Sequence, residues 1–408
     1  MRILIITQVF YPDTVATGQV LWDLAEFIAA KGNTVTTITS KYPYEDKHQV
    51  YPNEEYVKGV RIIRLGQSKL GKSNSFFRII DFFSFNISIF IKLLGIRSKD
   101  YDVILGTTVP PFLALIGVLI SKIKKIPFCY YVMDLQPELS IASGLLKSKS
   151  FFSRILTYLG NYSINKSSLI ISLDNFMTQY LCERGAKLDN IITVPIWPLM
   201  ENRYTGSRIE NPFRKKFDFG DKIVCMYSGN HAYVHPLDTI LNTAKALSND
   251  DRFLFVFIGG GVRKKDVTNF VKENGIRNVL QLPFQPRNII HESLASADVQ
   301  IVILGDGMVG FTHPNKIYGA LFVGKPILYV GPQQSHVTEI LSELPGNIIC
   351  QHGEVKLLTN KLIEFADSSV NDWKKIGDNN SNYAERNFNP DFLKNKIYQG
   401  LLSLNDRN

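Results

Sequence analysis

The chain has 408 residues, of which 45% are hydrophobic and 20% are charged, and its net charge is +9. This composition excludes a mainly disordered chain, and the length suits two domains. The four cysteines have neither metal-ligand nor redox spacing, which predicts buried thiols in a reducing compartment. The positive charge favours phosphate-bearing or anionic-lipid partners, and because no nucleic-acid motif is found we expect no nucleic-acid partner.

The first half of the chain alternates short apolar runs with helical stretches. The predicted strands are residues 2–7, 34–39, 60–65, 102–106, 128–133, 169–173 and 191–194. These runs are continuous rather than alternating, which is typical of parallel strands covered on both faces. Right-handed crossovers between them predict a doubly wound sheet.

A change of character at residues 196–215, with prolines, charges and no period, predicts an interdomain linker. A second alternating series follows, with strands predicted at residues 223–227, 254–258, 279–282, 299–304 and 327–330. We therefore expect an α/β protein with two Rossmann-like, doubly wound parallel-sheet domains that face a central cleft. The predicted bounds are 1–197 and 216–388, followed by a C-terminal helical segment, 389–408, that crosses back to the first domain.

Three strand–loop–helix segments are candidate anion sites, because glycine gives ligands access to backbone amides and helix N-termini attract anions. The first loop ends near Gly18, although a simple turn is the alternative. The second contains Gly229, Asn230 and His231, with ordinary surface histidines as the alternative. The G-x-G-x-x-G fingerprint is absent from the first loop, which argues against a dehydrogenase.

The third candidate segment combines glycines with cations. Gly260 and Gly261 follow a buried strand and precede Arg263 and Lys264 at an expected helix start. Cations are unfavourable there unless an anion offsets them, and a diphosphate would do so. A solvated basic helix face is the alternative.

A fourth segment, residues 310–326, also places a cation at the start of a helix. Pro314 and Asn315 are suited to begin the helix, and Lys316 falls in its first turn.

In the first half of the chain, Asp134 and Glu138 follow a predicted strand, where either could orient an acceptor hydroxyl or take its proton. A helix cap plus a surface acid is the alternative for this pair.

These segments together resemble the retaining family 4 glycosyltransferases, and among them bacterial enzymes of surface-polysaccharide assembly such as colanic-acid and N-acetylfucosamine transferases. The resemblance rests on residues 2–12, 134–138, 227–230, 257–261 and 314–326. It implies the GT-B fold, retention at the anomeric carbon, no obligatory metal and no cofactor. It also implies that the second domain holds a nucleotide-sugar donor, with uridine our expected base, and that the first domain holds the acceptor.

The resemblance turns the candidate residues into role predictions. The predicted catalytic residues are Asp134 and Glu138. The predicted donor-binding residues are Gly18, Gly229, Asn230, His231, Gly260, Gly261, Arg263, Lys264, Pro314, Asn315, Lys316 and Tyr318. One departure from the family pattern is that Gly319 stands where a second glutamate, often a ribose contact, would fall. A second is that the usual arginine and lysine are missing from residues 228–235.

The aromatic stretch at residues 76–94 indicates a segment that lies on a membrane or binds a lipid tail, with a buried crossover helix as the alternative. Cations that could meet anionic head groups are Lys69, Lys72, Arg78, Lys92, Arg97, Lys99 and those of residues 122–125. No apolar run is long enough to span a bilayer. We therefore expect a cytoplasmic protein, peripheral on the inner membrane, whose acceptor is a polyprenyl-diphosphate-linked saccharide of O-antigen or capsule assembly.

Two other functions fit the same plan. A nucleotide-sugar epimerase or related isomerase would act on the donor alone. A non-catalytic partner subunit would keep the fold after losing its acids, and Gly319 is the residue that favours it.

Overall fold

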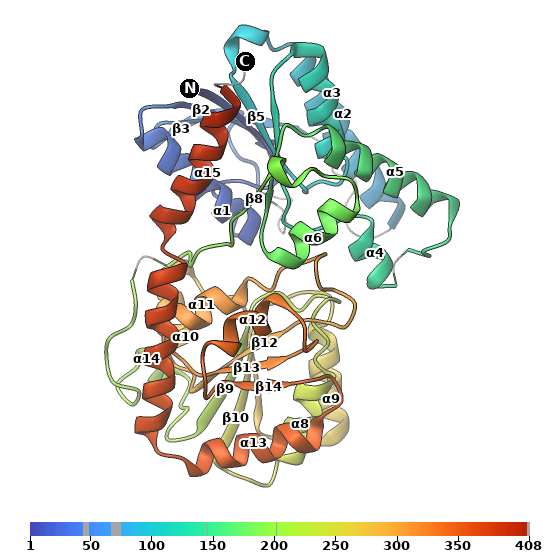
Figure 1. The fold of residues 1–408 in the computed structure, drawn as a ribbon. Helices are drawn as coiled ribbons and strands as arrows, with labels where there is room; N and C mark the ends of the chain where they lie inside the picture. Colours follow the sequence, from blue (N-terminus) through green and yellow to red (C-terminus); the bar gives the residue numbers. More distant parts are fainter. Residues whose placement is uncertain (44–48, 67–74, 145, 201, 406–408) are drawn as a thin grey trace. The chain divides into compact units, whose positions relative to one another are not determined.

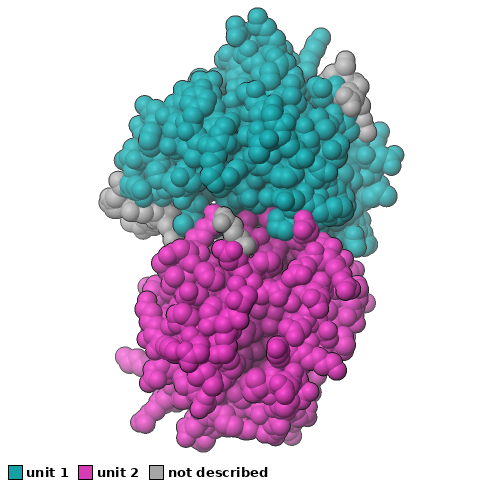
Figure 2. Space-filling view, turned by 90° about the vertical axis from the view of Figure 1, so that its left-hand side faces the viewer, with its two compact units in different colours: residues 1–195, 310–312, 390–408 teal, residues 196–309, 313–389 magenta. Residues whose placement is uncertain are grey.

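The computed structural model describes residues 1–43, 49–66, 75–144, 146–200 and 202–405, which form two compact units. Unit 1 comprises Met1–Pro195, Gly310–Thr312 and Pro390–Asn408, and unit 2 comprises Ile196–Val309 and His313–Asn389 (Figure 2). Each unit is an α/β layer structure built on one sheet (Figure 1).

The sheet of unit 1 has the strand order β3-β4-β2-β1-β5-β6-β7-β8, and β3 alone pairs antiparallel. Its strands are β1 (Arg2–Ile6), β2 (Thr34–Ser40), β3 (Glu54–Val57), β4 (Val60–Leu65), β5 (Val103–Thr107), β6 (Phe128–Tyr131), β7 (Leu169–Ser172) and β8 (Ile191–Thr193). Its helices are α1 (Ala16–Ala30), α2 (Ser75–Leu94), α3 (Leu113–Lys124), α4 (Glu138–Ala142), α5 (Phe151–Lys166), α6 (Asn175–Glu183) and α15 (Pro390–Asn405). The central strands are buried along their whole length, as expected for parallel strands covered on both faces.

The sheet of unit 2 is entirely parallel, with the order β11-β10-β9-β12-β13-β14. Its strands are β9 (Ile223–Ser228), β10 (Phe253–Ile258), β11 (Val279–Leu282), β12 (Val299–Ile303), β13 (Ile327–Val330) and β14 (Ile348–Cys350). Its helices are α7 (Pro212–Lys216), α8 (Asp238–Ala246), α9 (Lys264–Asn274), α10 (Ile290–Ala295), α11 (Lys316–Phe322), α12 (His336–Ser342), α13 (Val355–Asp367) and α14 (Val370–Asn387).

Consecutive residues of β9 belong to different hydrophobic clusters. Cys225 and Tyr227 pack in one cluster with β10, α8 and α13, while Val224 and Met226 pack in another with Phe213 and Phe219. Since side chains alternate along a strand, the two clusters lie on opposite faces of the sheet. Both faces are therefore covered, and the predicted α/β class with two doubly wound parallel sheets is confirmed.

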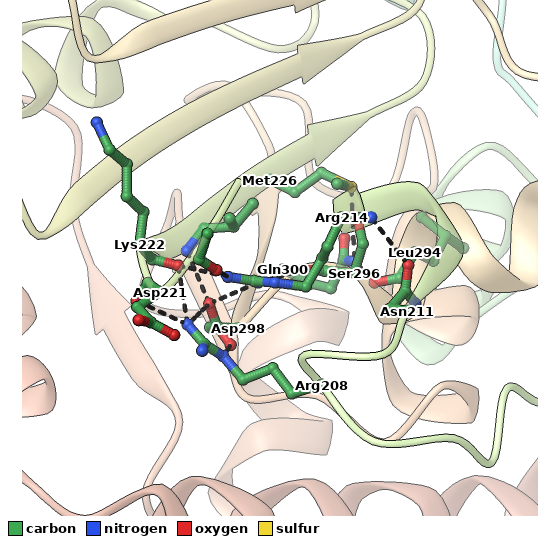
Figure 3. A network of polar contacts seen from close by, with 12 residues as sticks. Arg208, Asn211, Arg214, Asp221, Lys222, Met226, Leu294, Ser296, Asp298 and Gln300 are labelled. Atoms are coloured by element: carbon green, nitrogen blue, oxygen red, sulfur yellow. Dashed lines mark hydrogen bonds and ion pairs between the residues drawn. The ribbon is translucent and has the colours of Figure 1, made fainter. Parts of the chain in front are cut away.

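The segment predicted as a linker is fixed to unit 2 by one carboxylate. Asp298 accepts hydrogen bonds from Arg208 Nη2 at 3.0 Å, Arg214 Nη1 at 3.1 Å and the Val224 amide at 2.8 Å (Figure 3). Asn211 caps α7 by accepting from the amides of Phe213 and Arg214. The chain before β9 is thus ordered by charge pairing and capping rather than by apolar packing alone.

The last helix, α15, belongs to unit 1. Lys394 lies 3.3 Å from Asp23 of α1, and Tyr398 hydroxyl bonds to the Asn33 side chain. Leu393, Ile397 and Leu401 of the same helix are buried. Among the described residues, no helix combines the length and apolarity that crossing a bilayer requires.

Candidate functional site

In unit 2, the turns after β9 and β10 pack backbone against backbone. The His231 amide donates to Gly260 oxygen at 2.7 Å, and the Arg263 amide donates to His231 oxygen at 3.0 Å. A Cβ on Gly259 would lie 2.1 Å from the Gly229 carbonyl oxygen, so this approach requires glycine. These two turns, residues 229–231 and 259–263, form a single platform at the carboxyl ends of neighbouring strands. Parallel sheets bind their ligands at this edge.

The platform exposes backbone donors. The N–H groups of Gly260, Gly261 and Val262 have no hydrogen-bond acceptor among the residues that the structure describes. Gly261 and Val262 are exposed, and the eleven-residue helix α9 begins at Lys264 directly after them. Successive free amides in front of a helix N-terminus attract an anion.

Lys316 reaches the platform from α11. Its stem lies against Gly229, where a Cβ would be 2.6 Å from Lys316 Cε, and its Nζ lies 4.8 Å from the centroid of the Tyr227 ring. Within the described part of the chain, no carboxylate is within ion-pair distance of this ammonium group. Burial lowers the pKa of Lys316 to about 8. Burying a cation without a counter-charge costs folding free energy, and an anionic ligand at this position would reduce that cost.

The predicted residue His231 is buried in the platform, with its side chain as well as its amide bound to Gly260. The ring Nδ1 donates to Gly260 oxygen at 3.1 Å. Burial is the main cause that lowers the pKa of His231, and the charge of Lys316 lowers it further. Nearby His235 donates from Nδ1 to Ile303 oxygen at 2.7 Å, and burial holds its pKa well below 6.5. Both imidazoles are therefore neutral near pH 7 and support the turn, while Lys316 supplies the charge.

Arg263 and Lys264 differ in their surroundings. The Arg263 guanidinium pairs with Asp266 at 2.6 Å and with Asp238 at 3.2 Å, so its charge is already offset inside unit 2. Lys264, the first residue of α9, has no acidic partner among the described residues. Asn230 is exposed at the edge of the platform, and its side-chain oxygen lies against Gly261. The role of each as a donor contact stays a prediction.

The remaining predicted donor residues of α11 lie in or near the core. Pro314 is buried and Asn315 is exposed at the start of the helix, where its side chain makes no capping bond. Tyr318 is buried, and its hydroxyl bonds to His313 Nε2 at 2.5 Å and to His336 Nε2 at 2.8 Å. The Tyr318 hydroxyl therefore serves contacts within unit 2.

The predicted catalytic pair and Gly18 all lie in unit 1. Asp134 accepts a hydrogen bond from the Thr312 hydroxyl at 2.5 Å. Glu138 is buried, pairs with Arg184 and accepts from the Tyr180 hydroxyl at 3.2 Å. Gly18 lies inside α1, where a Cβ would be 3.3 Å from the Phe10 amide nitrogen. Gly18 thus permits close packing of α1 on the preceding loop.

Sequence reasoning missed three contributors to these groups: Tyr227 beneath Lys316, the amide of Val262, and Arg184 beside Glu138. Tyr227 was part of a recognised motif, but its burial next to the ammonium is a tertiary fact. Arg184 is distant in sequence from Glu138, so no spacing signal connects the two.

Among the described residues, no group of three or more His, Cys, Asp or Glu side chains is placed to hold a metal ion.

Two curated proteins resemble the sequence over much of its length, although no family model matches it. The putative colanic acid biosynthesis glycosyl transferase WcaI of Escherichia coli K12 is 23% identical over 366 residues, covering 87% of this chain and 89% of WcaI. The probable glycosyltransferase WbjE of Pseudomonas aeruginosa is 25% identical over 262 residues, or 64% of each chain.

Solved structures share the fold over nearly the whole chain. HepE of Anabaena, determined in complex with UDP and glucose, has a TM-score of 0.73 at 15% identity and covers 99% of this chain and 100% of its own. Sucrose-phosphate synthase of Thermosynechococcus elongatus has a TM-score of 0.79 at 13% identity, with full coverage of both chains. WaaG, a glycosyltransferase involved in lipopolysaccharide biosynthesis, has a TM-score of 0.71 at 14% identity and 98% coverage of both. With the sequence relatives, these likenesses confirm the expected resemblance to bacterial polysaccharide glycosyltransferases: the chain is a glycosyltransferase of the GT-B fold.

Proposed function

We propose that the protein is a retaining glycosyltransferase that moves a sugar from a UDP-linked donor to a lipid-linked saccharide in bacterial O-antigen or capsule assembly. The observation that carries the donor part is Lys316, which is desolvated and has no carboxylate partner among the described residues, on the platform whose Gly260 and Gly261 amides have no acceptor there either. A diphosphate matches both features, since it supplies negative charge and several acceptor oxygens. The names of WcaI, WbjE and WaaG support the polysaccharide context, and the UDP in HepE supports uridine.

In the proposed reaction, the bond between the anomeric carbon and the diphosphate oxygen breaks while the acceptor hydroxyl forms a bond on the same face of the sugar. The hydroxyl proton passes to the departing diphosphate, which is the route that resemblance to the family implies. Lys316 and the platform amides stabilise the negative charge that grows on the leaving group. The proposed reaction needs no metal ion, because Lys316 and the platform amides supply the positive charge at the diphosphate.

Asp134 and Glu138 take different parts in this proposal. Arg184 neutralises Glu138, so we assign Glu138 a positioning role in the loop between β6 and α4. We assign the orientation of the acceptor hydroxyl to Asp134, whose carboxylate is held by the Thr312 hydroxyl. Asp134→Asn should lower kcat more than it changes UDP affinity.

The test is incubation of the purified protein with UDP-sugars, with and without bacterial lipid extract. Release of UDP that requires the extract, together with a labelled lipid product, is the expected result. A new nucleotide-sugar formed without extract would indicate an isomerase instead. No turnover with any donor would indicate a non-catalytic partner subunit.

A further inference from the structure

We propose that α5 and α3 of unit 1 form a docking face for a bilayer that contains anionic lipid, with Phe151 and Phe152 inserted among the lipids. The inference rests on the proposed function in one respect, since a lipid-linked acceptor requires the enzyme to work at a membrane. Binding to a lipid surface can be measured without sugar transfer, so the two proposals can fail separately.

Four large apolar or aromatic side chains in the first half of α5 are exposed to solvent. Phe151 is 80% exposed, Phe152 56% and Tyr158 70%, and Ile155 is exposed as well. The buried residues of the same helix are Ser153, Ser163 and Ile164. This inversion of the usual pattern is typical of a helix whose apolar face meets lipid or a partner.

The exposed stripe continues onto α3. Residues 151, 155, 158 and 162 follow one face of α5, and Lys122 of α3 donates to the Tyr162 hydroxyl at 2.6 Å. Leu119 and Ile123, on either side of Lys122, are also exposed. The two helices pack side by side in unit 1, so the stripe spans both (Figure 1).

The third neighbour, α2, adds a similar stripe. Ile87, Ile91 and Leu94 are exposed at helical spacing, while Phe85 and Ile89 are buried. Lys124 of α3 donates to Leu94 oxygen at 2.6 Å at the end of α2. The predicted membrane segment, residues 76–94, is therefore a crossover helix that also exposes apolar side chains. The side chains of 76–83, including Arg78, and the predicted cations Lys69 and Lys72 lie outside the described residues.

The charged residues within these helices and the segments beside them are cations, although Arg97, after α2, is paired with Asp100 at 3.0 Å. Residues 84–99, 113–127 and 139–167 contain no Asp or Glu. Their cations are Lys92, Arg97, Lys99, Lys122, Lys124, Lys125, Lys147, Lys149, Arg154 and Lys166. Lys147, Lys149 and Arg154 are exposed on both sides of the Phe151–Phe152 pair. Basic residues that flank exposed aromatic residues complement an anionic lipid surface.

The same charge pattern argues against protein partners. Lysine is depleted from protein–protein interfaces, whereas here it surrounds the aromatic pair. Association of two copies through this face would bring cations against cations. The bilayer is therefore the occupant that the chemistry of α3 and α5 fits best.

The test is flotation of the full chain with vesicles of phosphatidylcholine, with and without phosphatidylglycerol, at low and high salt. We expect binding only with phosphatidylglycerol, weakened by salt. The Phe151→Ser/Phe152→Ser variant should bind at least about a hundredfold more weakly, and Lys147→Ser/Lys149→Ser/Arg154→Ser about a hundredfold more weakly.

Matched controls change the same side-chain types elsewhere. Tyr56→Ser/Phe392→Ser removes two exposed aromatic residues, and Lys272→Ser/Lys374→Ser/Lys375→Ser removes three exposed cations of unit 2. Both should bind vesicles as the unchanged chain does, and all variants should keep its thermal melting and UDP affinity. Equal losses in the controls, no binding of the unchanged chain to anionic vesicles, or a dimer that Phe151→Ser/Phe152→Ser abolishes would overturn the proposal.

Discussion

The ammonium group of Lys316 lies 4.8 Å from the centroid of the buried Tyr227 ring. The ring face partly offsets the charge, which explains how the lysine tolerates a position where no carboxylate of the described residues pairs with it. It does so without occupying a hydrogen-bond donor of the ammonium, so these donors remain available to an anion. Several expectations depend on this pair.

The first expectation concerns the pH dependence of UDP binding. Because burial lowers the pKa of Lys316 to about 8, a diphosphate that binds the ammonium form must bring a proton with it above that pH. UDP affinity should be constant just below about pH 8 and fall by up to about tenfold per pH unit above it. Calorimetry in buffers of different ionisation enthalpy should show proton uptake only above about pH 8.

The matched variant for this pH effect is Lys316→Arg, because guanidinium stays protonated throughout the range. Its UDP affinity should not show the alkaline decline. The same decline in Lys316→Arg would mean that another group causes it.

The stability of the protein should change with pH in the opposite direction from UDP affinity. The unfolded chain keeps the lysine proton up to about pH 10, whereas the folded chain loses it above about pH 8. The free energy of unfolding should therefore rise with pH between about 8 and 10.

Asp298 should be essential for the stability of unit 2. Asp298→Ala leaves Arg214 buried without its carboxylate, and breaking a buried pair costs about 3–5 kcal/mol. Urea unfolding followed by circular dichroism measures the loss. Asp250→Ala, which removes a partner of the exposed Arg252, is the control and should cost much less. Equal effects of the two would show that the network in Figure 3 does not hold the segment before β9.

Gly319 should tolerate alanine. It lies inside α11, and a Cβ there would meet Leu294 Cδ1 at 3.6 Å and Met200 Cε at 3.7 Å, which are ordinary contacts. Gly319→Ala should therefore stabilise the protein by about 0.5–1 kcal/mol. Gly324→Ala, at φ +68 and 3.2 Å from Gly377 oxygen, should destabilise it instead. Loss of stability in Gly319→Ala would mean that the space beside Leu294 is smaller than the structure shows.

Glu138 and Arg184 should behave as a structural pair. Arg184→Met leaves the buried Glu138 without its cation and should cost about 3 kcal/mol. The Glu138→Gln/Arg184→Met double variant should recover part of that loss, which a double-mutant cycle of urea unfolding measures. Additive losses would show that the two side chains are not coupled and would return Glu138 to the candidates for acid–base work.

Much of the fold was predictable because the buried strands are unbroken apolar runs bounded by turns. The two missed strands show where that signal ends. β3 lies at the edge of its sheet, with Glu54 exposed and Tyr56 exposed, so it lacks an apolar run. β14 has only three residues, Ile348–Cys350, which is too short to separate from a loop by composition.

The site was predictable in its chain positions but not in its contacts. Glycines after strands and a cation at a helix start are visible in sequence, and they led to Gly229, Gly260 and Lys316. Which cation is already neutralised depends on tertiary contacts: Arg263 meets Asp238 of α8, and the sequence offers no spacing rule for that pair. The burial that sets the pKa of Lys316 is likewise a property of the folded unit.

The most direct measurement is isothermal titration calorimetry of UDP at pH 7 with the unchanged chain, Lys316→Met and the control Lys265→Met, which removes an exposed cation of α9. A lost contact between an ammonium and a diphosphate should weaken binding about tenfold to a hundredfold in Lys316→Met. Lys265→Met should bind UDP as the unchanged chain does. Equal UDP affinity in Lys316→Met and the unchanged chain would contradict the assignment of this lysine to the diphosphate.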